Sequence, residues 1–135
     1  MTYFADGSTY SYINTGEAGP RVNVGWLGAG HPYSTGLVSE DLVAALARLC
    51  RKGVFHTRGF HHCEFCVPVE SGGGPPVPMS SRDEEGEFII GGAEIRVTGP
   101  SGIIFAAPDM IIHYVTDHGY KPPEEFLAAL GSGAN

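Results

Sequence analysis

A cluster of sulfur and nitrogen donors lies near the middle of the chain. Five of them occur within the eleven residues from 56 to 66, namely His56, His61, His62, Cys63 and Cys66. Zinc prefers thiolate and imidazole ligands in tetrahedral sites, and two cysteines separated by two residues can hold one ion from a single tight turn. The spacing therefore predicts that Cys63 and Cys66 bind a transition metal, with Zn²⁺ as the expected ion. His56 and His62 are expected to face solvent.

Three histidines compete to complete the metal shell. His113 and His118 form a His-x4-His pair, which falls within the spacing of the second half of Cys2His2 sites. His61, two residues before Cys63, is the alternative for one position. The sequence thus predicts that the metal ligands are drawn from His61, Cys63, Cys66, His113 and His118. It does not decide which histidines complete the shell.

Other chemistries share parts of this pattern. His62-Cys63-Glu64 resembles half of a zinc deaminase motif, but no cysteine follows Cys66 to supply the other half. The CxxC spacing also suits a thiol redox pair, although such a pair is expected to open a helix after a strand, and the nearby histidines favour a metal.

A catalytic zinc with three protein ligands, a water and Glu64 as base remains an alternative. An interpretation without any metal also remains, in which the cysteines are small buried apolar residues and His113 and His118 are ordinary polar residues of a helix and its cap. No catalytic residue is assigned, and enzymatic activity stays undecided.

The longest predicted element is a helix that begins after Ser39 and runs to about Arg51. Ser39 suits the N-cap, and Glu40 and Asp41 place negative charge in the first turn, where the helix dipole favours it. Apolar residues recur at helical spacing along the segment. Cys50 belongs to that apolar face and is expected in the core rather than at the metal.

Alternating apolar residues predict the strands. Arg21 to Leu27 has the period of a half-buried strand. Phe88 to Ile90, Ala93 to Thr98 and Ile103 to Ala106 are separated by glycine-rich turns, so they predict a three-stranded antiparallel meander with Gly91-Gly92 as its first turn. Two short helices should follow, one from about Pro108 to Gly119 and one after Pro122-Pro123. The expected fold class is α+β, with a mainly antiparallel sheet, one longer helix and two short C-terminal helices.

Length and composition predict one domain over residues 1–135. Within it, residues 70–87 are rich in Gly, Pro and acidic residues and are expected to form a flexible loop, and 131–135 a disordered tail.

The net charge and the number of cysteines limit the classes of binding partner and the compartment that we expect. The net charge is −7 with only eight Lys and Arg, so nucleic acid and anionic membranes are not expected partners. The chain has no apolar run of about 18 residues and no export signal, and its three cysteines do not form an even-numbered disulfide framework. A cytoplasmic location is expected. A small molecule at the glycine-rich loop from Gly25 to Tyr33, or a protein at the 70–87 loop, remains a possible partner.

Four segments carry a resemblance to a bacterial family of short uncharacterised proteins: VGWLxxGHPYxTG (24–36), RGFHHCEFC (58–66), AEIRVTGPSG (93–102) and APDMIIHYVTDHGYKPPEEF (107–126). The resemblance places a G-x-H-x-C-x-x-C element on Gly59, His61, Cys63 and Cys66, and an H-Y-x-x-x-H element on His113, Tyr114 and His118. It implies a role for His61 rather than His62. The family carries no assigned activity, so the resemblance supports the site and supplies no function.

The expected function is therefore that of a small zinc-binding protein of undefined biochemical role. Two alternatives come from other classes. One is a metal-dependent enzyme that acts on a small molecule at an open zinc position, and the other is a protein-interaction module. The number of protein ligands distinguishes a structural zinc site from a zinc enzyme. Four protein ligands leave no open position at the ion, whereas three leave one for water or substrate.

Overall fold

The structure is a computed structural model of the chain. It describes residues 3–10, 20–56, 61–66, 79–99 and 102–132. Within this part of the chain, no helix has the length and apolar character that crossing a membrane requires.

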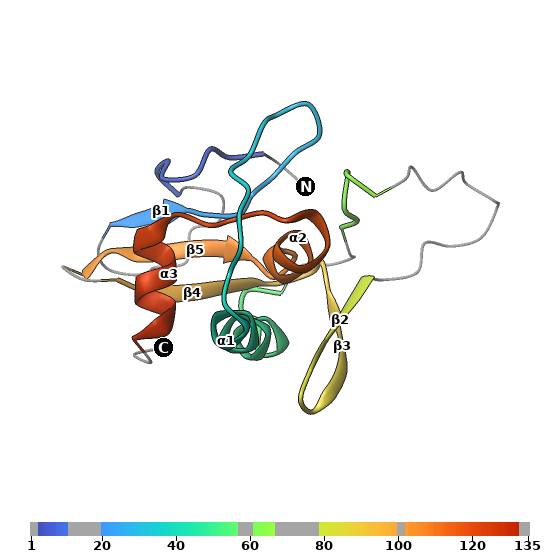
Figure 1. Ribbon diagram of the computed structural model, residues 1–135. Coiled ribbons are helices and arrows are strands. Elements are labelled where there is room, and N and C mark those ends of the chain that lie inside the picture. The colour runs from blue at the N-terminus through green and yellow to red at the C-terminus, as the bar shows by residue number, and fades with distance from the viewer. Residues whose placement is uncertain (1–2, 11–19, 57–60, 67–78, 100–101, 133–135) are drawn as a thin grey trace.

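A three-stranded sheet forms the centre of the fold (Figure 1). Its strands are β1 (Arg21–Asn23), β4 (Glu94–Thr98) and β5 (Ile104–Pro108), in the order β1-β5-β4. β5 pairs parallel with β1 and antiparallel with β4. As the central strand it is covered on both faces, which is why four of its five residues are buried.

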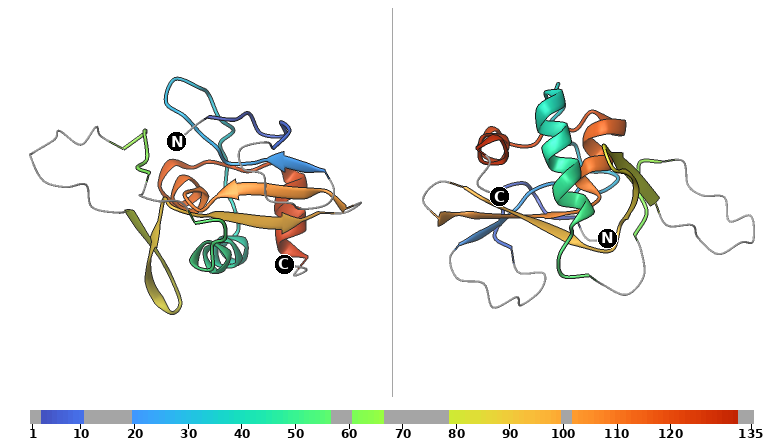
Figure 2. Two further views of the ribbon diagram at one scale, coloured as in Figure 1. Left: turned by 180° about the vertical axis from the view of Figure 1, so that it is seen from behind. Right: turned by 90° about the horizontal axis from the view of Figure 1, so that it is seen from below.

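Three helices lie on one side of this sheet (Figure 2). They are α1 (Glu40–Arg51), α2 (Ile111–His118) and α3 (Glu124–Gly131). α1 begins as predicted, since the Ser39 Oγ accepts a hydrogen bond from the Leu42 N–H. α2 ends at Gly119, whose left-handed φ of 66° suits glycine. The α+β class and the pattern of one longer and two short helices are confirmed.

The opposite face of the sheet is covered by the N-terminal segment and by Trp26. Tyr10, Trp26 and Ala106 form a small buried cluster there, with Phe4 packed against it. The Trp26 Nε1 donates a hydrogen bond to the Ala106 carbonyl at 3.0 Å. This contact fixes the start of the loop that follows β1.

A second, two-stranded antiparallel sheet projects from the fold (Figure 1). It consists of β2 (Met79–Asp83) and β3 (Gly86–Ile90). The strands β3, β4 and β5 follow one another along the chain as the predicted meander requires, and β4 pairs with β5. In the pairing, however, β3 lies against β2 rather than against β4.

The Gly91-Gly92 turn explains this difference. Gly91 has a φ of 103°, and its carbonyl accepts a hydrogen bond from the His61 N–H at 2.8 Å. Its own N–H donates to the Asp109 Oδ1 at 2.8 Å. These two long-range partners hold the turn open, so β3 leaves the central sheet instead of folding back on β4.

The predicted loop over residues 70–87 also differs in part. Residues 79–83 form β2 and residues 86–87 begin β3. The two strands pair antiparallel, so each supplies partners for the backbone N–H and C=O groups of the other. Residues 70–78 lie outside the described part of the chain. Of the predicted tail, Gly131 ends α3 and residues 133–135 lie outside the description.

Candidate metal centre

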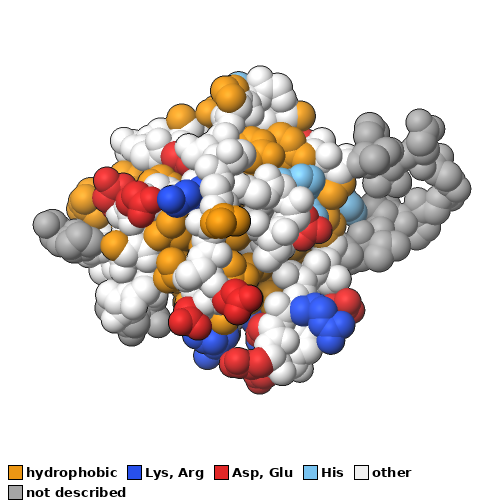
Figure 3. All heavy atoms as spheres, in the orientation of Figure 1, with side chains coloured by type: hydrophobic (Ala, Val, Ile, Leu, Met, Phe, Trp, Pro, Cys, Tyr) orange, Lys and Arg blue, Asp and Glu red, His pale blue; other side chains and the backbone are white. Residues whose placement is uncertain are grey.

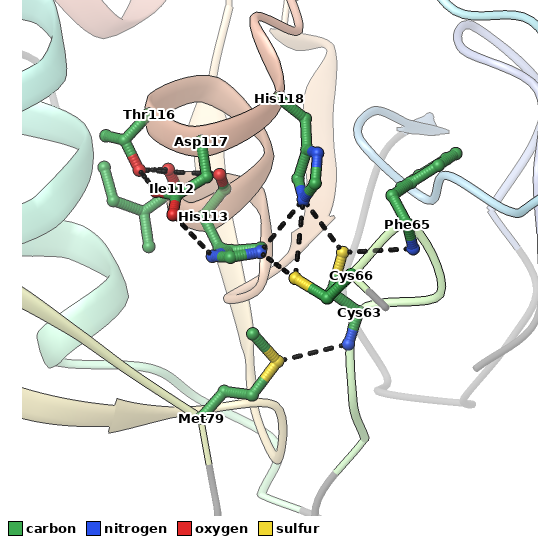
Figure 4. Close-up of polar contacts among 9 residues, drawn as sticks. All are labelled: Cys63, Phe65, Cys66, Met79, Ile112, His113, Thr116, Asp117 and His118. Carbon is green, nitrogen blue, oxygen red and sulfur yellow. Dashed lines mark hydrogen bonds and ion pairs between the residues drawn. The ribbon is translucent and has the colours of Figure 1, made fainter. Parts of the chain in front are cut away.

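Cys63, Cys66, His113 and His118 come together at one point (Figure 4). Each offers one ligand atom, and all four atoms lie within 4.8 Å of one another. The His118 Nε2 is 3.2 Å from the His113 Nε2 and 3.3 Å from the Cys63 Sγ. The Cys66 Sγ is 3.3 Å from the His113 Nε2 and 3.6 Å from the His118 Nε2.

These separations match the edges of a zinc tetrahedron. Typical Zn–N and Zn–S bonds imply edges of about 3.3 Å between two nitrogens and about 3.6 Å between nitrogen and sulfur. The nitrogen pair and three nitrogen–sulfur pairs differ from these values by a few tenths of an ångström or less. The four side chains could therefore hold one ion with little rearrangement.

α2 supplies both imidazoles. His113 lies in its first turn and His118 is its last residue. The Nδ1 of His113 faces the Asp117 Oδ2 at 3.8 Å, one helical turn away. A carboxylate on that side favours the tautomer with the proton on Nδ1, which leaves Nε2 free to accept a metal. Burial lowers the pKa of His113, and that also favours the neutral imidazole.

The segment 61–66 supplies both sulfurs in a tight turn. The Phe65 N–H donates to the Cys63 Sγ at 3.4 Å, and the Cys63 N–H donates to the Met79 Sδ at 3.1 Å. Burial raises the pKa of the Cys63 thiol, while the backbone N–H groups of Phe65 and Cys66 oppose that rise. Backbone donors aimed at sulfur stabilise the thiolate that a metal requires.

The centre is buried on one side and open on the other. Cys63 and His113 are 6% and 7% exposed, whereas Cys66 and His118 are half-buried. Phe65 covers the cluster, with its ring centroid 5.5 Å from that of His118 and 5.9 Å from that of Tyr114. Figure 3 shows histidine side chains reaching the surface beside hydrophobic ones. An ion could enter from this side.

The remaining residues singled out in the sequence lie elsewhere. His61 does not belong to the group of four, and its backbone N–H pairs with Gly91 instead. Cys50 is buried in the core, as predicted, and His56 is exposed, as predicted. Glu64 is exposed, and its carboxylate accepts a hydrogen bond from the Ala29 N–H at 2.9 Å. It thus fastens the glycine-rich loop.

Sequence reasoning missed three neighbours of the cluster: Phe65, Met79 and Asp117. Asp117 was detectable, because it follows His113 by four residues on a predicted helix and must share its face. Phe65 and Met79 gave no such indication. Their contacts depend on how β2 and the segment 61–66 meet in space.

Comparison with known proteins places the chain in a family. A protein family described as a domain of unknown function matches residues 2–131. No curated protein matches the chain, and no solved structure does.

Proposed function

The chain belongs to the family described as a domain of unknown function (DUF7919), and we propose that Cys63, Cys66, His113 and His118 bind one Zn²⁺ ion as a structural centre. In this proposal, the ion fastens the segment 61–66 to α2. The observation that carries it is the convergence of four donor atoms within 4.8 Å.

Hydrogen bonding among the four side chains explains this convergence poorly. The His118 Nε2 has three neighbours, at 3.2, 3.3 and 3.6 Å. A neutral imidazole nitrogen either donates one proton or accepts one hydrogen bond, so it can satisfy only one of them. A cation at the centre satisfies all four donors at once. This supports a metal over a cluster of thiols and imidazoles alone.

The donor set favours zinc. Two thiolates and two imidazoles suit tetrahedral Zn²⁺, whereas Mg²⁺ and Ca²⁺ require oxygen ligands. Two thiolates balance the charge of the ion, so the filled site is neutral and can lie partly buried. A neutral site also adds no further negative charge to a chain whose acidic residues already outnumber its basic ones.

The number of ligands favours a structural role over a catalytic one. Four protein ligands complete a tetrahedron and leave no position for water or substrate. The ion would join two parts of the chain that lie about fifty residues apart, since Cys66 and His113 are separated by 47 positions. We further propose a reducing compartment such as the cytoplasm, because both thiols must stay reduced to bind the ion.

Elemental analysis of the full chain, purified without a histidine tag, tests the proposal. Wild-type protein should contain one zinc per chain, and Cys63→Ser should lose it. Cys50→Ala is the matched control, since Cys50 is buried in the core and is not one of the four grouped residues, and it should retain the metal. Wild-type protein free of zinc after purification and zinc supplementation, or full retention by Cys63→Ser, would refute the assignment.

A further inference from the structure

A cleft opens beside the glycine-rich loop, between the N-terminal segment and residues 27–34. Its volume is about 350 Å³, which lies in the range of small-molecule sites. A closed cavity of roughly 150 Å³ already accepts a benzene molecule, so this cleft has room for one ring and a short chain. The sequence had suggested a small-molecule site in this loop.

The lining of the cleft is aromatic and acidic. Tyr3, Phe4 and Tyr33 contribute rings, Leu27 and Pro32 add apolar surface, and Asp6 and Ser34 are the polar members. None of these described lining residues is basic. Aromatic faces and a carboxylate both attract a cation, and the net charge of −7 adds to that preference.

Asp6 is held in a fixed orientation. Its Oδ1 accepts a hydrogen bond from the Gly25 N–H at 3.0 Å, and its Oδ2 accepts one from the Tyr120 hydroxyl at 2.7 Å. Burial and the Asp6 carboxylate raise the pKa of Tyr120, so that hydroxyl stays a donor. Each carboxylate oxygen keeps a further lone pair. Asp6 itself is exposed, so a ligand can reach it.

The walls are fixed by contacts outside the cleft. Tyr3 stacks on His31 with ring centroids 3.8 Å apart and planes within 4°. The Phe4 N–H donates to the Trp26 carbonyl at 3.1 Å, and the Tyr33 hydroxyl donates to the His118 carbonyl at 3.1 Å. A preformed wall loses little conformational entropy when a ligand binds.

We propose that this cleft binds a small organic ammonium ion with an aromatic body, its ring against Tyr3, Phe4 and Tyr33 and its charged group at Asp6. The proposal does not rest on the zinc assignment, although the Tyr33 wall is hydrogen-bonded to the carbonyl of His118. It goes beyond the zinc assignment, because a cation with an apolar body fits neither the donor set nor the size of that cluster.

Two probes of similar size and opposite charge test it: protonated 2-phenylethylamine and 3-phenylpropionate. Each is titrated into the full, zinc-supplemented chain while backbone amide signals are followed by NMR. The amine should give saturable shifts centred on the lining residues, and the carboxylate should give none there at the same concentration. Equal binding of the two probes, saturable shifts centred elsewhere, or no response to the amine at millimolar concentration would each overturn the proposal.

Substitutions test whether Asp6 binds the ammonium group of the probe. Asp6→Asn should weaken binding of the amine by about fivefold, the loss expected for one solvent-exposed ion pair. Asp41→Asn makes the same change in the first turn of α1, away from the cleft, and should leave binding as in wild type. Ser34→Phe fills the cleft and should abolish binding of the amine even if Asp6→Asn proves unstable. Unchanged affinity in a folded Asp6→Asn or Ser34→Phe variant contradicts the assignment.

Discussion

The Nε2 atoms of His113 and His118 lie 3.2 Å apart, although the residues are five positions apart along α2. Five positions correspond to about 140° around an ideal helix, so the two side chains leave the helix in different directions. They meet because His118 is the last helical residue, directly before the left-handed Gly119. The end of α2 therefore sets the geometry of the cluster.

This geometry makes His113 and His118 the histidine ligands of the proposed zinc site. His113→Gln and His118→Gln should each weaken zinc binding by a factor of at least about ten, because a three-ligand shell remains. Competition with a coloured chelator measures the affinity. Replacing zinc with Co²⁺ then reports whether the shell is tetrahedral and contains thiolate.

His61→Gln is the matched control for these variants. The structure leaves His61 out of the group of four, so zinc affinity should stay within about twofold of wild type, as for a substitution outside the metal shell. A larger loss of zinc affinity in His61→Gln than in His118→Gln would show that His61, and not His118, is a metal ligand.

Removal of the metal should loosen one region of the chain. If zinc fastens residues 61–66 to α2, chelation should lower the melting temperature and speed amide hydrogen exchange in that segment. Exchange in the first turn of α1 should change little, since the Ser39 cap that holds it does not involve the four grouped residues. The Cys63→Ser variant supplies the control, because without zinc it should not respond to the chelator. A wild-type melting temperature unaffected by chelation would make the ion functional rather than structural.

The elements that local sequence controls were predictable. Ser39, the acidic first turn and the apolar spacing define α1 without reference to the rest of the chain. Gly119 ends α2 for the same reason. Donor type and spacing identified a set of five candidate ligands that contains all four clustered residues. They did not show that His61 is the one left out.

Strand pairing was harder to predict from the sequence. The alternation of Phe88 to Ile90 indicates a strand but does not identify its partner. The pairing depends on two distant hydrogen bonds at Gly91, whose carbonyl accepts from the His61 N–H and whose N–H donates to the Asp109 carboxylate. The same contact explains His61. Its backbone is required at that turn, so its position near Cys63 in the sequence does not bring it into the group of four.

Asp109 makes stability depend on pH. Burial raises its pKa to about 6, against about 4 for an unfolded chain. The folded protein therefore binds this proton more readily, and the free energy of unfolding should rise as pH falls from 6 to 4. Asp109→Asn cannot titrate, yet its side-chain carbonyl can still accept the Gly91 N–H. It should be more stable than wild type at pH 8 by up to about 2 kcal/mol, because the amide cannot accept all of the Gly91, Gly92 and Ala93 N–H groups that the carboxylate accepts. The gain should diminish toward pH 4.

Denaturant unfolding at several pH values measures this difference. The comparison is made with both proteins in the same zinc-free buffer, so that the proposed zinc site does not contribute to the difference. Glu87→Gln removes an exposed acid from β3 and should follow the wild-type profile. An Asp109→Asn variant less stable than wild type at pH 8 would show that the buried carboxylate is needed in its charged form.

Arg51 holds the β2–β3 hairpin to α1. Its Nε and Nη2 donate to the two oxygens of Asp83 at 2.5 and 2.7 Å, and Nη2 also donates to the Gly86 carbonyl at 2.9 Å. This pairing lowers the pKa of Asp83 to about 2. The stabilisation is therefore present above about pH 4, the unfolded value, and is lost as pH falls toward 2.

Arg51→Ala should lower the melting temperature at pH 7 and speed amide exchange in the hairpin, because a bidentate pair is lost. Arg48→Ala is the control, since Arg48 forms a longer ion pair with the exposed Glu84, at 3.7 Å. It should change the melting temperature little. Equal effects of the two substitutions would show that the hairpin does not depend on Arg51.

Gly91 links the hairpin to the segment 61–66, which carries both thiols of the proposed site. A Cβ at this position would lie 2.5 Å from the His61 carbonyl oxygen, and the residue has a φ of 103°. Gly91→Ala should therefore cost both the strain of a positive φ, of order 1–3 kcal/mol, and the displacement of His61. Because His61 begins the segment that carries both thiols, zinc affinity should fall together with stability.

Gly86→Ala separates the two effects. Gly86 has a φ of 122°, but a Cβ there would meet nothing within 4 Å. It should therefore show the strain without the clash, and zinc affinity should remain that of wild type. Denaturant unfolding and zinc competition on the two variants measure stability and affinity independently. If Gly91→Ala keeps full zinc affinity, the contact between Gly91 and His61 does not position the thiols, and the turn stabilises the fold alone.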